Sequence, residues 1–434
     1  MASNDRALRE AEQLLTSGDW HGALTALDAT DDPDDPRVLA GVGAAQWWLG
    51  DLTGSIRARE RAFVQFQRSR EPERAVEIAL RLGFDYQSHA SNNAAAEGWV
   101  HRAERIGEVL GDDGLTGWIR LARSDLEGSV ANRISDAREA LRIARQVNDP
   151  DLELCALSAL GHLLVSNGAI SEGIALLDDA MAGTAAEEWT SPETVVFTSC
   201  NMLVAAVEAV DFARAVGCVA AASDFAERYR APFLSSQCRV VYGRVLFLTG
   251  DWAGAEEELA FASSTDIPPT FRGQAAATLA ELHLARGDVG AAKATIAAVP
   301  HGLWSGPPLV RLRLVEGNSA AAAATAIDHL RTDQTPMLTR CHVLEVLGES
   351  WISLGDHEAA EATARDLGRL ASSVDRDLPT ARWHRLEGRL MLATDRATDA
   401  HNHLSLAIDG FDRLHLRYEV AKSQAMLAEA LSST

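Results

Sequence analysis

A turn that recurs along the chain is the feature that most constrains its fold. Each copy follows an apolar stretch and precedes an amphipathic one, which is typical of a helix–turn–helix unit. A glycine in the turn can end the first helix in the left-handed conformation, and in most copies an aspartate can cap the second. The clear copies are Ser17–Trp20, Leu49–Leu52, Asn167–Ile170, Thr249–Trp252, Arg286–Val289 and Leu354–His357.

Small residues spaced twelve positions apart accompany these turns. The first of each pair falls on the helix before the turn (helix A) and the second on the helix after it (helix B). Small side chains at both places let the two backbones approach closely. The pairs are Ala11/Ala23, Gly161/Gly173, Gly243/Ala255, Ala280/Ala292, Gly348/Ala360 and Gly388/Ala400.

These positions resemble the Gly/Ala and Ala positions of the tetratricopeptide consensus. Weaker turns fill the gaps between the clear ones, at Asn92, Gly128, Asp211, Asn318 and Thr394. The whole chain then divides into hairpins, with no segment left over for a globular domain. We therefore predict an all-α fold, a tetratricopeptide-type right-handed α-solenoid of about eleven helical hairpins. Residues 1–434 would form a single superhelix with no separate DNA-binding or catalytic domain.

Three stretches resemble a more specific family. They are Ala44–Arg61 (AAQWWLGDLTGSIRARER), the segment Cys200–Ala262, and the final hairpin HNHLSLAIDGFDRLHLRYEVAKSQAMLAEAL. Together they resemble the tetratricopeptide, MalT-like region of LuxR-type transcriptional regulators, over most of the chain from about Ala40 onward. The resemblance implies an array that senses a ligand or binds a partner.

Regulators of that family usually continue into a C-terminal helix-turn-helix that binds DNA. This sequence stops at Ser432-Ser433-Thr434, directly after the last repeat helix, and no basic recognition helix is present. Two readings remain open. The chain is a stand-alone protein built on the regulator's array, or it is a regulator from which the output domain has been removed.

The acidic balance argues against nucleic acid and anionic membranes as direct partners. The chain has 62 Asp and Glu against 40 Lys and Arg, a formal net charge of −22. Binding phosphates requires clustered Lys and Arg, which this composition does not readily supply. No apolar run approaches the roughly 18–20 residues of a membrane span, and the N-terminus shows no secretory pattern. We therefore expect a cytoplasmic protein.

The five cysteines are scattered, and none forms a CxxC pair, so we expect free thiols and neither a disulfide framework nor a zinc site. Other catalytic or cofactor motifs are incomplete in this sequence. Gly41-Val42-Gly43 lacks the preceding strand of a dinucleotide site, and His401 and His403 point apart on a helix. We therefore predict no catalytic residues, no metal and no cofactor.

The polar and aromatic residues of the A helices are the candidates for binding, because helix A lines the concave face of a tetratricopeptide array. Arg239 with Tyr242 resembles an anion-and-aromatic clamp, and Arg120 with Arg123 a second basic pair. His342, Glu345 and Glu349 share one helical face, which is either an acid–base site or an ordinary polar stripe. The groove candidates are Trp47, Tyr86, His89, Arg120, Arg123, His162, Asn201, Arg239, Tyr242, Arg272, His283, Arg311, His342 and His384.

The tryptophans of the turns are expected to pack between hairpins, at Trp20 and Trp252. Of the neighbours Trp47 and Trp48, one is expected to pack inward and the other to face the groove. Trp304 lies in the Pro/Gly-rich connector His301–Pro308, where it either fills a gap in the superhelix or covers a ligand.

Two functions are consistent with these patterns. The first is a regulatory scaffold that binds a peptide, a partner protein or a small effector in its concave groove. The alternative is a small-molecule-binding protein, or an enzyme of specialised metabolism, built on the same array. About eleven hairpins exceed one turn of such a superhelix, so the groove is able to close into a tunnel. A deep, closed cavity with His89, His162 or His283 near a carboxylate would favour the alternative.

Overall fold

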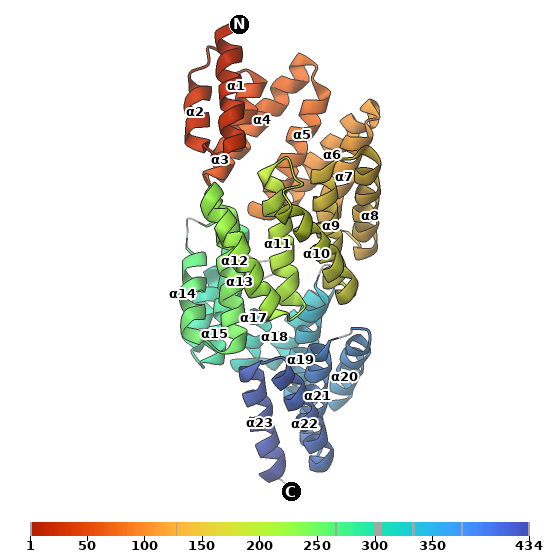
Figure 1. The fold of residues 1–434 in the computed structure, drawn as a ribbon. Coiled ribbons are helices and arrows are strands. Elements are labelled where there is room, and N and C mark those ends of the chain that lie inside the picture. Colours follow the sequence, from red (N-terminus) through yellow and green to blue (C-terminus); the bar gives the residue numbers. More distant parts are fainter. Residues whose placement is uncertain are drawn as a thin grey trace.

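The computed structural model describes residues 2–126, 128–264, 267–298, 306–331, 335–374 and 376–432. Within these residues every regular element is helical, and the helices follow one another in a superhelical coil from the N-terminus at the top of Figure 1 to the C-terminus at the bottom. None of the described helices is both long and apolar enough to cross a membrane.

Eleven helical hairpins and one further helix make up the described chain. Hairpins 1–6 are α1 (Ala2–Ser17) with α2 (Trp20–Asp28), α3 (Pro36–Trp48) with α4 (Leu52–Ser69), α5 (Pro72–Phe84) with α6 (Asn93–Leu110), α7 (Asp113–Asp125) with α8 (Val130–Val147), α9 (Pro150–Ser166) with α10 (Ile170–Ala185), and α11 (Pro192–Glu208) with α12 (Phe212–Tyr229). Hairpins 7–11 are α13 (Pro232–Thr249) with α14 (Trp252–Ala262), α15 (Pro269–Ala285) with α16 (Val289–Ala298), α17 (Gly306–Val315) with α18 (Ser319–Leu330), α19 (Met337–Leu354) with α20 (His357–Ser372), and α21 (Asp377–Ala393) with α22 (Ala397–Arg413). A short π-helical segment, η1 (Asp85–His89), extends α5, and α23 (Arg417–Ser432) closes the array. The predicted α-solenoid of helical hairpins is confirmed.

The turns form by the predicted chemistry. Gly50 and Gly250 have φ values of 83° and 101°, in the left-handed region where a side chain would be strained. The following aspartates cap the next helix, since Asp51 accepts from the Gly54 amide at 2.8 Å and Asp251 from Gly254 at 3.1 Å. The weaker predicted turns also fall between the A and B helices of hairpins.

The twelve-residue pairs mark the closest approach of helices A and B. A Cβ placed on Gly161 of α9 would lie 2.7 Å from the carbonyl oxygen of Gly173 on α10. A Cβ on Gly173 would in turn lie 2.5 Å from the Gly161 carbonyl. No real side chain fits at these distances, so the glycines set the spacing of this hairpin.

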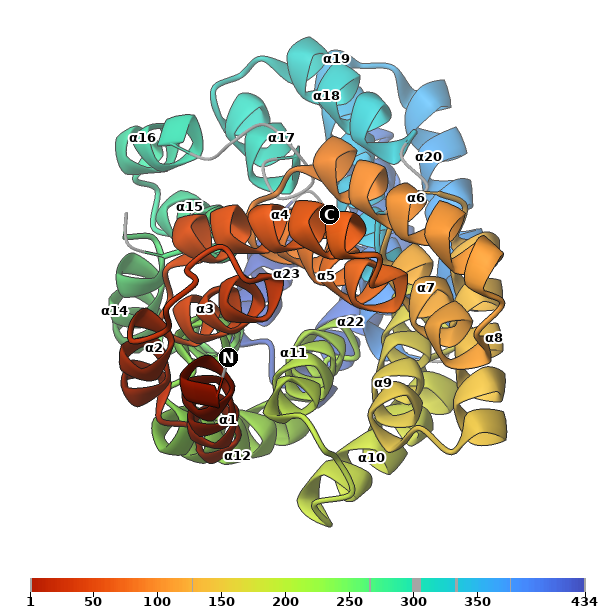
Figure 2. The same cartoon turned by 90° about the horizontal axis from the view of Figure 1, so that it is seen from above.

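The coil packs against itself about five hairpins further along the chain. In Figure 1 the first hairpins rest on α12 and α13, and from above the helices form a ring (Figure 2). Hydrogen bonds, ring contacts and shared apolar clusters join hairpins 1 and 6, 2 and 7, 3 and 8, 5 and 10, and 6 and 11. The first three are the contacts Trp20–Tyr229, Trp47–Phe233 and Ser91–Thr270, and the last two are apolar clusters that contain Val165 with Met337 and Phe212 with Leu378.

Tryptophans build much of this contact between turns. Trp20 stacks on Trp48 with ring centroids 4.6 Å apart, and its Nε1 donates to the Tyr229 carbonyl at 2.7 Å. Trp252 contacts Tyr418 of α23 at 5.4 Å between ring centroids, so both turn tryptophans pack between hairpins as predicted. The prediction that Trp47 or Trp48 faces the groove is wrong, because both are 3% exposed. Trp304 lies outside the described residues.

We predict that Gly161→Ala lowers the free energy of unfolding by about 1–3 kcal/mol, because the new Cβ would meet the Gly173 carbonyl. Gly98→Ala on α6 is the matched control, since nothing lies within 4 Å of its Cβ position. Alanine there should stabilise by up to about 1 kcal/mol through helix propensity alone. Urea unfolding of both variants measures the difference, and equal effects at the two sites would contradict the close approach of α9 and α10.

Candidate functional site

A cavity of about 140 Å³ lies inside the coil, between the A helices of hairpins 6 to 11. Its walls come from α11, α13, α15, α19, α21 and α23, together with Pro307 of α17 and the start of α12. The A helices therefore line the concave side, as the sequence predicts. The contacts between turns enclose part of this side, and the cavity remains partly open.

The cavity has an apolar part and a polar part. Val204 and Val207 on α11 and Val240, Val241 and Leu248 on α13 form much of the apolar wall. The ionisable side chains that line the cavity are Glu208, Arg244, Glu281, His342, Arg382 and Glu419. Such a mixture of apolar surface with a few polar groups is typical of ligand sites.

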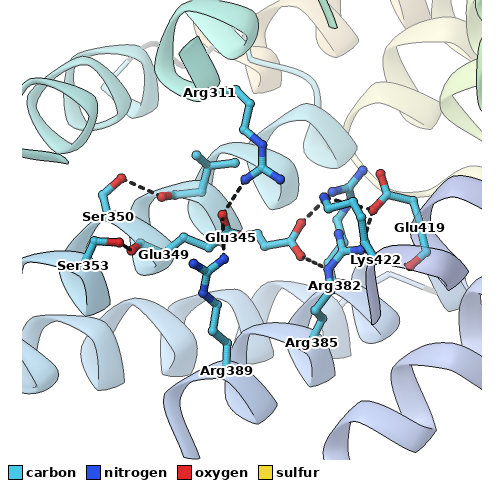
Figure 3. A network of polar contacts seen from close by, with 11 residues as sticks. Arg311, Glu345, Glu349, Ser350, Ser353, Arg382, Arg385, Arg389, Glu419 and Lys422 are labelled. Atoms are coloured by element: carbon cyan, nitrogen blue, oxygen red, sulfur yellow. Dashed lines mark hydrogen bonds and ion pairs between the residues drawn. The ribbon is translucent and has the colours of Figure 1, made fainter. Parts of the chain in front are cut away.

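A network of buried ion pairs joins successive A helices at one side of this cavity (Figure 3). Glu345 on α19 accepts from Arg382 Nη1 and from Arg385 Nε of α21, both at 2.6 Å. Arg385 also pairs with Glu419 of α23 and lies over the Phe411 ring at 4.5 Å. These charges are almost completely buried, since Arg385 is 1% and Glu345 is 2% exposed.

The same network extends to α17 through Glu349. Glu349 pairs with Arg311 of α17 and, at 3.2 Å, with Arg389 of α21. Burial opposes ionisation of Glu349, but Arg311 and Arg389 outweigh it and hold the pKa of the carboxyl below its usual value. In the predicted stripe of His342, Glu345 and Glu349, the two glutamates therefore form structural ion pairs.

Positive charge exceeds negative charge in this network. Five cations, Arg311, Arg382, Arg385, Arg389 and Lys422, face three carboxylates, Glu345, Glu349 and Glu419. Burial, with Arg311 and Arg385 nearby, lowers the pKa of Lys422 to about 8. Such a lowered pKa is the expected response of an amine buried among other cations.

His342 lines the cavity and is neutral near pH 7. Burial, followed by the charge of Arg382, holds its pKa well below the usual value. The predicted candidates His342 and Arg311 are therefore brought to the same region, one on the cavity wall and one in the adjoining network.

Glu208 is a carboxyl on the cavity wall whose pKa is raised by burial. Burial raises its pKa to about 7, although a hydrogen bond from Ser166 Oγ at 2.6 Å and the charge of Arg244 oppose the shift. The predicted candidate His162 lies beside it, with Nε2 3.9 Å from Glu208 Oε2. Burial lowers the pKa of His162 to about 4, so the imidazole is neutral.

The predicted residues of η1 lie elsewhere, in the contact between turns. His89 packs among Trp47, Phe84, Phe233 and Phe271, with ring centroids 4.4–5.9 Å away. Burial lowers its pKa to about 4, despite the Asp85 carboxylate 3.7 Å from Nδ1. The prediction that Trp47 and His89 face a groove is therefore corrected, since both belong to the core that closes the coil.

The predicted anion clamps are occupied by the protein's own carboxylates. Arg239 donates to Glu258 of α14 at 3.0 Å and lies over the Phe261 ring at 4.1 Å. Arg120 and Arg123 share Asp136 of α8, with hydrogen bonds of 2.7 and 3.0 Å. These arginines bind their own helix B, so they do not form the predicted clamps.

The remaining candidates are dispersed. The Tyr86 hydroxyl donates to Glu60 at 3.0 Å, Asn201 Nδ2 donates to Ser158 Oγ at 3.1 Å, and His384 Nδ1 lies 3.1 Å from His403 Nδ1. Tyr242, Arg272 and His283 are half-buried on α13 and α15, and their role in binding stays a prediction. Among the described residues no three His, Cys, Asp or Glu side chains are grouped as metal ligands would be.

Several lining residues escaped sequence reasoning, namely Glu208, Gln237, Arg244, Glu281, Arg382 and Glu419. A signal for part of the site was present. Arg382, Arg385 and Arg389 share one face of an A helix, and Glu345 and Glu349 share one face of the preceding A helix. Matching the charged faces of successive A helices would have revealed the network.

No family model and no curated protein matches the chain. Solved structures that it is similar to include the APC/C hetero-tetramer Cut9–Hcn1, at 13% identity over 98% of this chain and 89% of that one, with a TM-score of 0.45. A tetratricopeptide repeat protein from Parabacteroides merdae has 12% identity over 75% of this chain and 100% of that one, with a TM-score of 0.29. Yeast Tom70 has 12% identity over 100% of this chain and 91% of that one, with a TM-score of 0.33. These superpositions are too loose to carry a conclusion about function.

We predict that Glu349→Gln lowers the free energy of unfolding by about 3–5 kcal/mol, because it leaves two arginines beside an uncharged side chain in a buried setting. Asp377→Asn is the matched control, because Asp377 forms a solvent-exposed pair with Arg413 and should cost at most about 1 kcal/mol. Chemical unfolding measures both changes. Similar small losses in the two variants would show that the network does not stabilise the fold.

Glu208→Gln should change how stability depends on pH. The folded pKa of about 7 exceeds the ordinary value of 4.5, so between these values the native state holds more protons than the unfolded state. Stability attributable to Glu208 is therefore present at low pH and is lost as pH rises towards 7, by up to about 3 kcal/mol. We expect the variant to lack this loss when unfolding is compared at pH 5 and pH 8. Parallel pH profiles for the two proteins would contradict the assignment.

Proposed function

We propose that this protein is a small-molecule-binding α-solenoid that holds its ligand in the central cavity. The supporting observation is the interior cavity, where polar and apolar side chains of six A helices meet around one space. Rigid helices held by contacts between turns keep such a site preorganised, which lowers the entropic cost of binding.

The size of the cavity supports a small ligand. A cavity of about 140 Å³ is close to the engineered cavity of about 150 Å³ that binds benzene in another protein. A ring or a short chain with one polar group fits such a space, whereas a peptide of several residues does not. A peptide or protein partner of this repeat scaffold would therefore need a surface other than the interior cavity.

The resemblance to the MalT-like arrays of LuxR-type regulators suggests a role for such binding. In this proposal the ligand is an effector, and its binding stabilises the closed coil relative to looser arrangements of the turns. The array itself does not bind DNA, in keeping with the net charge of −22.

Glu208 supports an enzymatic alternative, because a carboxyl with a pKa of about 7 is suited to acid–base chemistry.

Native mass spectrometry of the freshly purified protein tests the proposal, with the denatured protein measured beside it. We expect a bound species of small mass that is lost on denaturation. Ala277→Phe on the cavity wall should abolish this species, because the added ring fills the cavity. Ala220→Phe is the matched control, since Ala220 is exposed on α12. A species retained by Ala277→Phe, or lost equally from both variants, would argue against binding in the cavity.

A further inference from the structure

Three buried nitrogen atoms on the cavity wall have no hydrogen-bond partner among the described residues. They are Gln237 Nε2, Arg244 Nε and Arg382 Nε. Gln237 is 2% and Arg382 is 7% exposed, so these donors are removed from solvent. Leaving a buried donor unpaired costs free energy, and all three atoms require the same kind of partner, an acceptor.

Arg244 differs from a neighbouring arginine on the same helix. Arg239 also lies on α13, but it bonds Glu258 at 3.0 Å and stacks over Phe261. Arg244 makes no hydrogen bond or ion pair with the described residues and lines the cavity. Its charge is therefore directed at the cavity without being bound to a carboxylate.

Arg244 and Arg382 line the cavity from α13 and α21. The positive charges of both arginines favour ionisation of the Glu281 carboxyl, which lines the cavity from α15. Arg382 also belongs to the network in which five cations face three carboxylates. The cavity thus adjoins a network that has more cationic than anionic groups, although Arg311, Arg389 and Lys422 are partly exposed.

The nearby acids do not cancel this excess fully. Burial raises the pKa of Glu281 and raises that of Glu208 to about 7, so the uncharged form of both is favoured relative to exposed glutamates. Glu419 is already bonded to Arg385 and Lys422. An anion that enters the cavity would supply both the acceptors and the charge that the wall lacks.

We propose that the ligand of this cavity carries an oxyanion, a carboxylate or a phosphate, to which Gln237, Arg244 and Arg382 donate hydrogen bonds. Charge-assisted bonds from guanidinium groups to oxyanions are among the strongest polar contacts in proteins. The rest of the ligand packs against the apolar wall of Val204, Val241 and Leu248. This inference rests on the proposed function and specifies the ligand class of the same site.

Calorimetric titration of the full chain with four probes tests the inference. Benzoate and phenyl phosphate carry the two candidate oxyanions on a ring that suits the cavity, inorganic phosphate carries the headgroup alone, and benzamide is the uncharged match of benzoate. We expect at least one oxyanion to bind about tenfold or more tightly than benzamide. The order of benzoate and phenyl phosphate then separates a carboxylate ligand from a phosphate ligand.

Variants test the named donors. Arg244→Met and the isosteric Gln237→Glu should each weaken oxyanion binding about tenfold or more, the first by removing a charge-assisted donor and the second by adding a negative charge. Arg239→Met is the matched control and should leave the affinity unchanged. Arg244 makes no hydrogen bond or ion pair with the described residues and acts on Glu208 and Glu281 through its charge alone. Arg244→Met should therefore change the melting temperature by no more than a few degrees, which separates a binding role from a structural one.

Three results would overturn the inference: benzamide binding as tightly as benzoate, Arg244→Met and Arg239→Met behaving alike, or no oxyanion binding at all. An uncharged or cationic species found by native mass spectrometry and lost in Ala277→Phe would also overturn it, while leaving the proposed function intact. If no bound species is found and neither benzamide nor any oxyanion binds, the proposed function fails as well.

Discussion

The Trp20 indole stacks on Trp48 and donates a hydrogen bond to the carbonyl of Tyr229, which lies 209 residues further along the chain. This contact, with its counterparts at Phe233 and Thr270, holds one turn of the coil on the next. The same kind of contact recurs one turn later, where Phe212 of hairpin 6 and Leu378 of hairpin 11 share an apolar cluster and both line the cavity. The cavity and its unusual burial of charge therefore depend on contacts between turns, because the hairpins alone do not enclose a space.

Inside the coil, ion pairs connect neighbouring A helices, whereas apolar packing connects the two helices within each hairpin. Replacing a buried ion pair by apolar groups often costs little, so such pairs are weak evidence for stability. They do restrict which helices can lie side by side, since Glu345 and Glu349 find their arginines only when α17, α19 and α21 are in register. In our proposal, an anion from outside the chain binds beside this network and balances its excess of positive charge.

The hairpins could be predicted from the sequence because their turns are local. A glycine at positive φ and an aspartate cap act over four residues, and the pairs of small residues act over twelve, so each is visible in a short window. The side chains that meet inside the coil lie far apart in the chain, as Gln237 and Arg382 do, and their meeting depends on superhelical pitch. The sequence therefore predicts Arg239 as a groove residue and gives no signal for Arg244. Both are arginines of one A helix, and only the packing of α14 and α21 decides which of them is bound to a carboxylate.

Formation of one engineered disulfide tests the closed coil most directly. Ser91 Oγ and Thr270 Oγ1 lie 2.7 Å apart although 179 residues separate them, so cysteines at both positions should form a disulfide. The native cysteines Cys155, Cys238 and Cys341 are buried, whereas Cys200 and Cys218 are half-buried, so the single variants serve as controls for background oxidation. We predict that the Ser91→Cys/Thr270→Cys protein forms the intramolecular bond under mild oxidation, seen as a loss of two hydrogens by mass, while neither single variant does. Two thiols that stay reduced in the folded double variant would show that hairpins 3 and 8 do not meet, and would contradict the packing of one turn of the coil on the next.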